Sequence, residues 1–128
     1  MAVTAQTILL AICVLMIKHW VADFLLQTVW QVHNKGRYGH PGGLLHSAIH
    51  VVCTLPVFVV LAPPTLSYGL SLLAGEYLFH YHVDWTKEQL NRTLGLKPDM
   101  SGFWYLLGLD QLIHGLTYVT IVWLLLPA

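Results

Sequence analysis

Residues 3–30 read VTAQTILLAICVLMIKHWVADFLLQTVW, a run in which apolar side chains predominate and only Lys18 and Asp23 carry a formal charge. A helix needs roughly 20 residues to cross a hydrocarbon core of about 30 Å, so this run is long enough to do so. Three further stretches have the same character and lie at about 44–62, 66–85 and 103–126. We therefore expect residues 1–128 to form a single transmembrane domain, an all-α, integral membrane four-helix bundle.

The composition excludes most other classes of protein. Apolar residues make up 56% of the 128 residues and charged residues only 9%, whereas a soluble domain carries about 25% charged residues. The mean hydropathy is +0.64. A net charge of zero argues against a nucleic-acid binder, because affinity for phosphates depends on an excess of Lys and Arg. The lipid bilayer is the expected environment of a multi-pass protein.

The basic residues favour one orientation in the membrane. They concentrate in the first loop and in or beside the third, at Lys35, Arg37, Lys87, Arg92 and Lys97. By the positive-inside rule these loops are cytoplasmic, and both termini are expected on the non-cytoplasmic side. No basic residue precedes the first run and no cleavage-site pattern follows it, so we expect this run to persist as a helix and not to be removed as a signal peptide.

Every predicted span carries histidine residues, and three of the four also carry acidic residues, at a spacing of four. The sets are His19 and Asp23, His46 and His50, Glu76, His80 and Asp84, and Asp110 and His114. Residues four apart lie on one face of an α-helix, so each span has one polar stripe. In an antiparallel arrangement the four stripes share a layer in the cytoplasmic half of the membrane, and we expect their side chains to face one another.

This polar layer predicts a metal site. An ionised acid near the bilayer centre costs about 2.5–3.5 kcal/mol, and the one cation within the spans, Lys18, points about 100° away from His19. A divalent metal offsets the cost because it binds neutral imidazoles and carboxylates together. Zinc is favoured, with iron or manganese as alternatives, and two ions fit better than one because zinc takes about four ligands. The predicted ligands are His19, Asp23, His46, His50, His80, Asp84, Asp110 and His114.

Residues beside the predicted ligands suggest supporting roles. Gln27, Thr117 and Tyr118 follow ligands on nearly the same helical faces, and we expect them to orient metal-bound imidazoles. His40 precedes a turn-rich Pro-Gly-Gly segment and could reach back over the site. His82 points about 160° away from His80 and is expected to lie outside it.

A metal-dependent hydrolase of a lipid or lipid-linked ester or phosphoester is the favoured function, because a bound metal activates water and polarises the substrate oxygen. Glu76 is the candidate general base, and Lys35, Arg37 and Lys87 are expected to bind the head group of the substrate. The alternatives are a proton or divalent-cation carrier, a haem or di-iron redox protein, and a small accessory subunit of a larger membrane complex. Whether the protein is an enzyme and whether it forms a homo-oligomer remain open at this point.

Four segments resemble one family. They are residues 19–27 (HWVADFLLQ), 38–46 (YGHPGGLLH), 80–87 (HYHVDWTK) and 108–114 (GLDQLIH). They are similar to the signature of DUF3307, a bacterial family of small membrane proteins with no settled activity. The resemblance implies a multi-pass protein of the cell inner membrane. Residues 40–47 (HPGGLLHS) are also similar to a His-rich segment of membrane proteins often labelled metal-dependent hydrolases.

Overall fold

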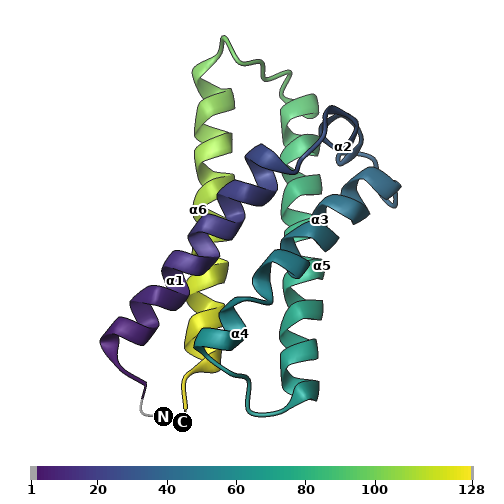
Figure 1. Ribbon diagram of the computed structural model, residues 1–128. Helices are drawn as coiled ribbons and strands as arrows, with labels where there is room; N and C mark the ends of the chain where they lie inside the picture. The colour runs from purple at the N-terminus through teal and green to yellow at the C-terminus, as the bar shows by residue number, and fades with distance from the viewer. Residues whose placement is uncertain (1–2, 128) are drawn as a thin grey trace.

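The computed structural model describes residues 3–127, and all the regular secondary structure in this range is helical. In chain order the elements are α1 (Ala5–Trp20), the π-helical segment η1 (Val21–Leu25), α2 (Val29–Asn34), α3 (Pro41–Thr54), α4 (Val57–Val60), α5 (Leu66–Thr93) and α6 (Ser101–Leu125). Figure 1 shows α5 and α6 side by side, with α1 and α3 crossing them obliquely. The two ends of the chain lie at the same end of the molecule.

Within residues 3–127, three helical segments are long and apolar enough to cross a membrane. They are Ala5–Leu25, Pro41–Val60 and Ser101–Leu125, with 21, 20 and 25 residues. The length and apolar composition of these segments indicate a membrane protein. Helix α5 has 28 residues but a much lower apolar content, because acidic and basic side chains interrupt it from Glu76 onward.

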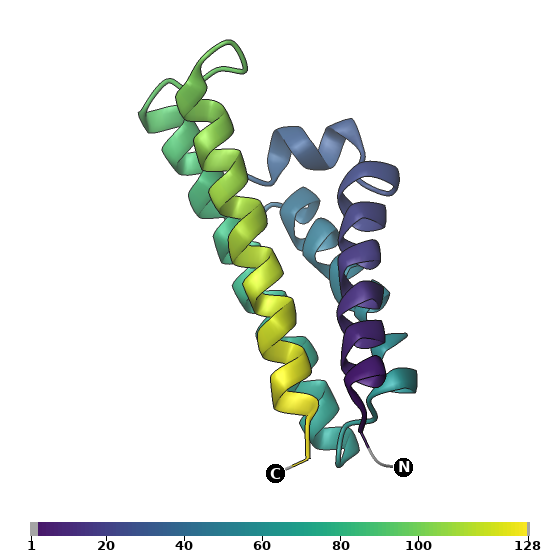
Figure 2. The same cartoon turned by 90° about the vertical axis from the view of Figure 1, so that its left-hand side faces the viewer.

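The first helix ends earlier than the run of apolar residues predicts. It widens into the π-turns of η1 and ends at Leu25, whereas the prediction extends to Trp30. The reason is local, because Thr28 begins a new helix. The side chains of Thr28 and Gln31 each accept a hydrogen bond from the other's backbone N–H, which is a capping box and a strong helix start. Figure 2 shows α2 lying across the end of α1 that is remote from the termini.

The second predicted span is two helices. Pro56 lacks a backbone N–H and its ring crowds the preceding turn, which breaks a helix, and α3 accordingly ends at Thr54. His40 caps the start of α3, with its Nδ1 accepting a hydrogen bond from the N–H of Gly42 at 3.0 Å. His40 therefore has a structural role and does not reach over the polar layer. The third predicted helix continues to Thr93, beyond the predicted end at residue 85.

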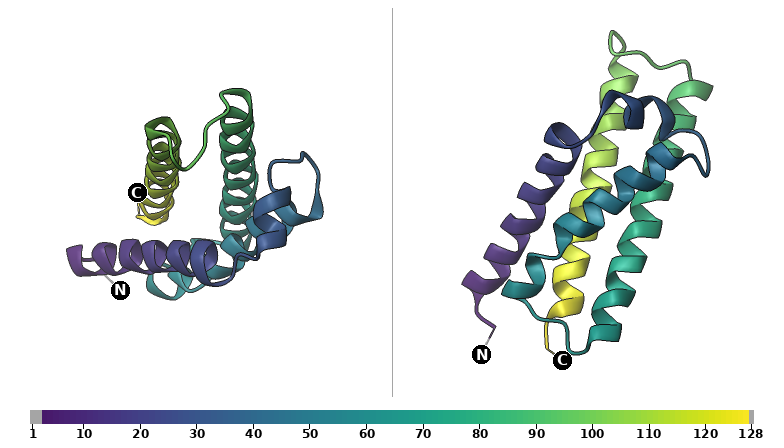
Figure 3. Two further views of the ribbon diagram at one scale, coloured as in Figure 1. Left: turned by 90° about the horizontal axis from the view of Figure 1, so that it is seen from above. Right: turned by 45° about the vertical axis from the view of Figure 1, so that its right-hand side comes forward.

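Apolar and polar residues occupy opposite halves of the interior. The half near the chain termini is an apolar cluster drawn from α1, α4 and α6, consisting of Ala11, Leu15, Val57, Leu61, Tyr118, Ile121, Val122 and Leu125. The other half lies among α1, α3, α5 and α6, whose arrangement is shown in Figure 3. That half contains the buried histidines and acids, and it is where the fold brings the four polar stripes together.

Candidate metal centre

Imidazoles and carboxylates from η1, α3, α5 and α6 meet in the polar half of the interior. Two groups have ligand atoms that all lie within 4.8 Å of one another. The first group consists of Asp23, His46, His50 and His80, and the second consists of His80, Asp84 and His114. Because His80 belongs to both groups, they form one continuous cluster.

Asp23 lies at one end of this cluster, in the π-turn of η1. Its Oδ1 is 2.9 Å from Nε2 of His50 and 3.3 Å from Nε2 of His46. Its Oδ2 is 3.2 Å from Nε2 of His19. Single π-turns inside helices are frequent at functional sites, and this one positions a carboxylate against imidazoles of two other segments.

Asp84 lies at the other end, on α5. Its Oδ2 is 3.1 Å from Nε2 of His46 and 3.7 Å from Nε2 of His80. Its Oδ1 is 3.3 Å from Nε2 of His114. Nε2 of His46 thus lies between the carboxylates of Asp23 and Asp84 and connects the two ends of the cluster.

The chemistry of the cluster fits a divalent metal. Among residues 3–127, Nε2 of His46 and Nε2 of His80 make no hydrogen bond of good geometry, although both side chains are buried and Nε2 of His46 lies 3.1 Å from a carboxylate oxygen of Asp84. Leaving a buried polar atom unpaired is costly, and a bound ion is one of the recognised explanations. Two ligands of a tetrahedral zinc, each about 2.0–2.1 Å from the ion, are about 3.3 Å apart. Most of the nitrogen–oxygen separations around Asp23 and Asp84 are close to this value.

His19 and Asp110 are two predicted ligands that lie outside both groups. His19 is hydrogen-bonded at both ring nitrogens, Nδ1 to the Tyr118 hydroxyl at 2.7 Å and Nε2 to Oε1 of Gln111 at 2.8 Å. Asp110 is buried, with its Oδ1 3.5 Å from Nε2 of His114. The structure thus brings six of the eight predicted ligands into the groups and leaves these two at the border.

The predicted supporting residues differ in their contacts. The Tyr118 hydroxyl contacts an imidazole, as expected. Gln27 donates instead to the backbone carbonyl of Asp23 at 2.9 Å. The prediction for Thr117 is wrong, because its hydroxyl donates to the carbonyl of Ile113, four residues earlier on the same helix. Gln111 was missed, although its position three residues before His114 puts both on one side of α6.

The lysines predicted to bind a head group mostly turn toward acids of the protein. Lys35 is buried, and its Nζ donates to Oδ2 of Asp84 at 3.2 Å. Burial lowers the pKa of Lys35, but the carboxylates of Asp84 and Asp23 outweigh burial and raise it above its usual value, so the side chain is charged at neutral pH. Nζ of Lys87 is 3.8 Å from Oδ2 of Asp110. Arg37 is exposed.

Lys18 and Glu76 form a buried ion pair beneath the cluster. Nζ of Lys18 is 2.5 Å from Oε1 of Glu76, and the two side chains are 4% and 1% exposed. Thr54 donates to the same oxygen at 2.9 Å, and Lys18 also donates to the backbone carbonyl of His50. The expectation that Lys18, about 100° from His19 on the helix, leaves the acids without a cationic partner is wrong for Glu76, so a metal is not required to neutralise Glu76. The spacing along α1 indicates that Lys18 is buried, because Lys18 lies on the same face as the buried Ala11 and Leu15.

A polar cavity of about 310 Å³ leads to the border of the cluster. It lies between η1, α5 and α6, and Lys35, Lys87, Asp23, Asp110 and Gln111 are among its lining residues. A small polar group entering this cavity meets one carboxylate of the first ligand group and the bordering carboxylate of Asp110.

Helices able to cross a membrane and a buried cluster of imidazoles and carboxylates define the class, an all-helical membrane protein with a candidate metal centre. The family model described as Protein of unknown function (DUF3307) matches residues 11–127. The chain belongs to this family. Neither a search of curated proteins nor a search of solved structures returned a match.

Glu76→Gln is expected to lower the free energy of unfolding by about 3–5 kcal/mol, because it leaves the ammonium of Lys18 buried without its partner. The measurement is reversible unfolding of the purified protein in mixed micelles. The double variant Lys18→Met/Glu76→Gln should be more stable than Glu76→Gln alone. Glu88→Gln, which removes a more exposed acid, is the matched control. Equal stability of Glu76→Gln and Glu88→Gln would show that the buried pair contributes nothing.

Proposed function

We propose that the chain crosses the membrane four times, as a four-helix bundle that forms one domain. Helix α5 connects two segments that are each able to cross, and its 28 residues extend about 42 Å, more than the hydrocarbon core of about 30 Å. Its acids Glu76 and Asp84 are buried and do not face lipid. The remaining charged residues of α5 lie in its last two turns, where a membrane–water interface accommodates them.

The proposed orientation follows from the basic residues. Those of the first and third loops lie on the cytoplasmic side, so both termini are on the non-cytoplasmic side of the cell inner membrane. In this orientation the polar half of the interior lies toward the cytoplasm, and the apolar cluster of α1, α4 and α6 lies toward the outside. The cavity that leads to the candidate ligands then opens on the cytoplasmic half.

The cluster is proposed to bind a divalent metal, zinc before iron or manganese. The observation that carries this proposal is the pair of buried Nε2 atoms of His46 and His80, which lie 3.1 Å and 3.7 Å from Oδ2 of Asp84 and make no hydrogen bond of good geometry within residues 3–127. Asp23, His46, His50 and His80 supply four ligands for one ion. Asp84 and His114 would bind a second ion together with His80, if the ring of His80 turns toward them. The same side chains can therefore form a dinuclear centre.

The reaction we propose is hydrolysis of an ester or phosphoester of a lipid or lipid-linked substrate. A metal held by Asp23, His46, His50 and His80 would polarise the substrate oxygen. Asp110 replaces Glu76 as the candidate base, since Glu76 is engaged by Lys18 and Thr54. Asp110 lines the cavity, and its Oδ1 is buried without a hydrogen-bond partner in the described part of the chain. It is therefore able to accept a proton from the attacking water. Lys87 and Lys35, which line the same cavity, would face the negative charge of the substrate.

Three observations weigh against the carrier, haem and accessory-subunit alternatives. A proton or cation carrier needs polar groups through the whole membrane, whereas the outer half is the apolar cluster defined above. Imidazole rings whose centroids are 3.8 Å apart for His50 and His80, and 4.2 Å apart for His80 and His114, leave no width between them for a haem. An accessory subunit with a structural metal has no need of a cavity that reaches the ligands.

His80→Ala should remove most of the bound metal, because His80 is common to both ligand groups. The protein is purified without added metal, and its zinc, iron and manganese are quantified by mass spectrometry. We expect about one to two zinc ions per wild-type chain. His82→Ala is the matched control, since His82 is exposed and its Nδ1 bonds to the backbone of Leu78. Wild-type protein without metal, or equal metal in the two variants, would refute the metal centre.

Asp110→Asn should retain the metal and reduce hydrolysis by about 10²–10⁴-fold, the usual contribution of a general base. The assay incubates the protein in vesicles of bacterial lipid extract and follows released fatty acid and phosphate by mass spectrometry. Asp99→Asn, an exposed change in the α5–α6 loop, is the control. If the metal-loaded wild type releases neither product, the metal is structural and the hydrolase proposal fails.

A further inference from the structure

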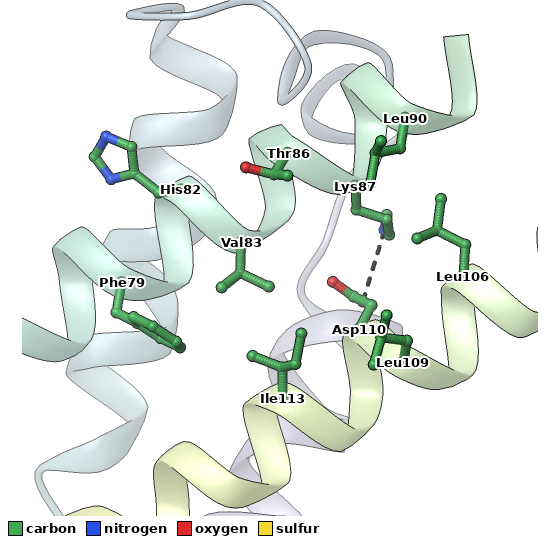
Figure 4. Close-up of a pocket in the computed structure, with 10 residues that line it drawn as sticks. All are labelled: Phe79, His82, Val83, Thr86, Lys87, Leu90, Leu106, Leu109, Asp110 and Ile113. Atoms are coloured by element: carbon green, nitrogen blue, oxygen red, sulfur yellow. Dashed lines mark ion pairs between the residues drawn. The ribbon is translucent and has the colours of Figure 1, made fainter. Parts of the chain in front are cut away.

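An apolar groove runs along the outside of α5 and α6, next to the polar cavity. It encloses about 230 Å³. In Figure 4, Phe79, Val83 and Ile113 lie around one end of the groove, and Lys87 and Asp110 approach each other across the other end. The leucines at positions 90, 106 and 109 lie near that polar end, and His82 and Thr86 are the remaining lining residues.

The groove and the polar cavity meet at the same two residues. Lys87 and Asp110 line both of them. A molecule lying in the groove therefore ends beside the ion pair that borders the cavity, and the cavity continues from there to Asp23. A ligand with an apolar body and a polar end would place its body in the groove and its polar end at the cavity.

The position of the groove selects a hydrocarbon chain as its occupant. Helix α6 is able to cross a membrane, and Phe79 and Leu109 at the groove are 48% and 51% exposed, so the groove opens where acyl chains surround a membrane protein. From Lys87 to Phe79 the helix rises about 12 Å over eight residues. This length is close to the hydrocarbon depth of one leaflet, half of about 30 Å.

We infer that the groove between α5 and α6 is the acyl-chain site of the lipid substrate. The chain lies against Phe79, Val83 and Ile113, with its methyl end toward the middle of the membrane. Its ester group lies beside Lys87 and Asp110, at the entrance of the cavity. The inference rests on the proposed hydrolase function and specifies its substrate as a lipid that enters sideways from the cytoplasmic leaflet.

Crosslinking with phosphatidylglycerol that carries a diazirine on one acyl chain tests the inference. The protein is reconstituted with this lipid, illuminated and digested, and labelled peptides are identified by mass spectrometry. Labelling is expected to concentrate at residues 79–83 and 106–113. Ile113→Trp should reduce this labelling by about tenfold or more, because the larger side chain occupies the groove. Leu106→Trp, at the polar end, should have the same effect.

Leu112→Trp is the matched control, because Leu112 is 57% exposed on α6 and does not line the groove. Metal content is measured for each variant, and unchanged metal in Ile113→Trp shows that the protein is folded. Labelling spread evenly over the exposed face of α6, or unchanged by both groove variants, would overturn the inference. Labelling in the groove should persist in His80→Ala, so failure of the metal centre and failure of the groove give different results.

Discussion

The buried carboxylate of Asp84 is the constraint on which the rest of the structure depends. It receives Lys35 from the segment after α2, His46 from α3, His80 from α5 and His114 from α6. A carboxylate in a low-dielectric interior is strongly destabilising when it lacks partners. Four segments of the chain must therefore converge on this point, and their convergence creates the cluster of imidazoles that we propose as a metal centre.

The interior is divided into a polar half and an apolar half. This division explains how a chain with few charged residues keeps several of them buried. Around Asp84 and Asp23 the acids are met by imidazoles and by Lys35. One layer deeper, Lys18 and Glu76 neutralise each other, with the ammonium 4.5 Å above the ring of Tyr118. Beyond Tyr118 the packing is apolar. Each buried charge thus either has an oppositely charged partner within the protein or lies in the cluster where we propose that a cation binds.

Much of this arrangement follows from local rules, and the remainder depends on tertiary contacts. The i,i+4 spacing was sufficient to predict that the stripes meet, because helical geometry determines which side chains share a face. The breaks at Leu25 and Pro56 depend on a capping box and a proline within otherwise apolar runs, which hydropathy does not detect. The inward turn of Lys35 was not predictable from its loop, since it is the distant carboxylate of Asp84 that attracts it. Similarly, the angle between Lys18 and His19 on the helix does not predict the burial of Lys18, because the packing of α1 against its neighbours decides which face is buried.

The central claim is that these imidazoles and carboxylates bind a metal, and X-ray absorption at the zinc edge tests it most directly. Protein purified in detergent without added metal should give a zinc edge with a first shell of nitrogen and oxygen at about 2.0–2.1 Å. Scattering from the outer atoms of several imidazole rings should be present. A first shell dominated by sulfur at about 2.3 Å, or a spectrum without imidazole scattering, would contradict the claim.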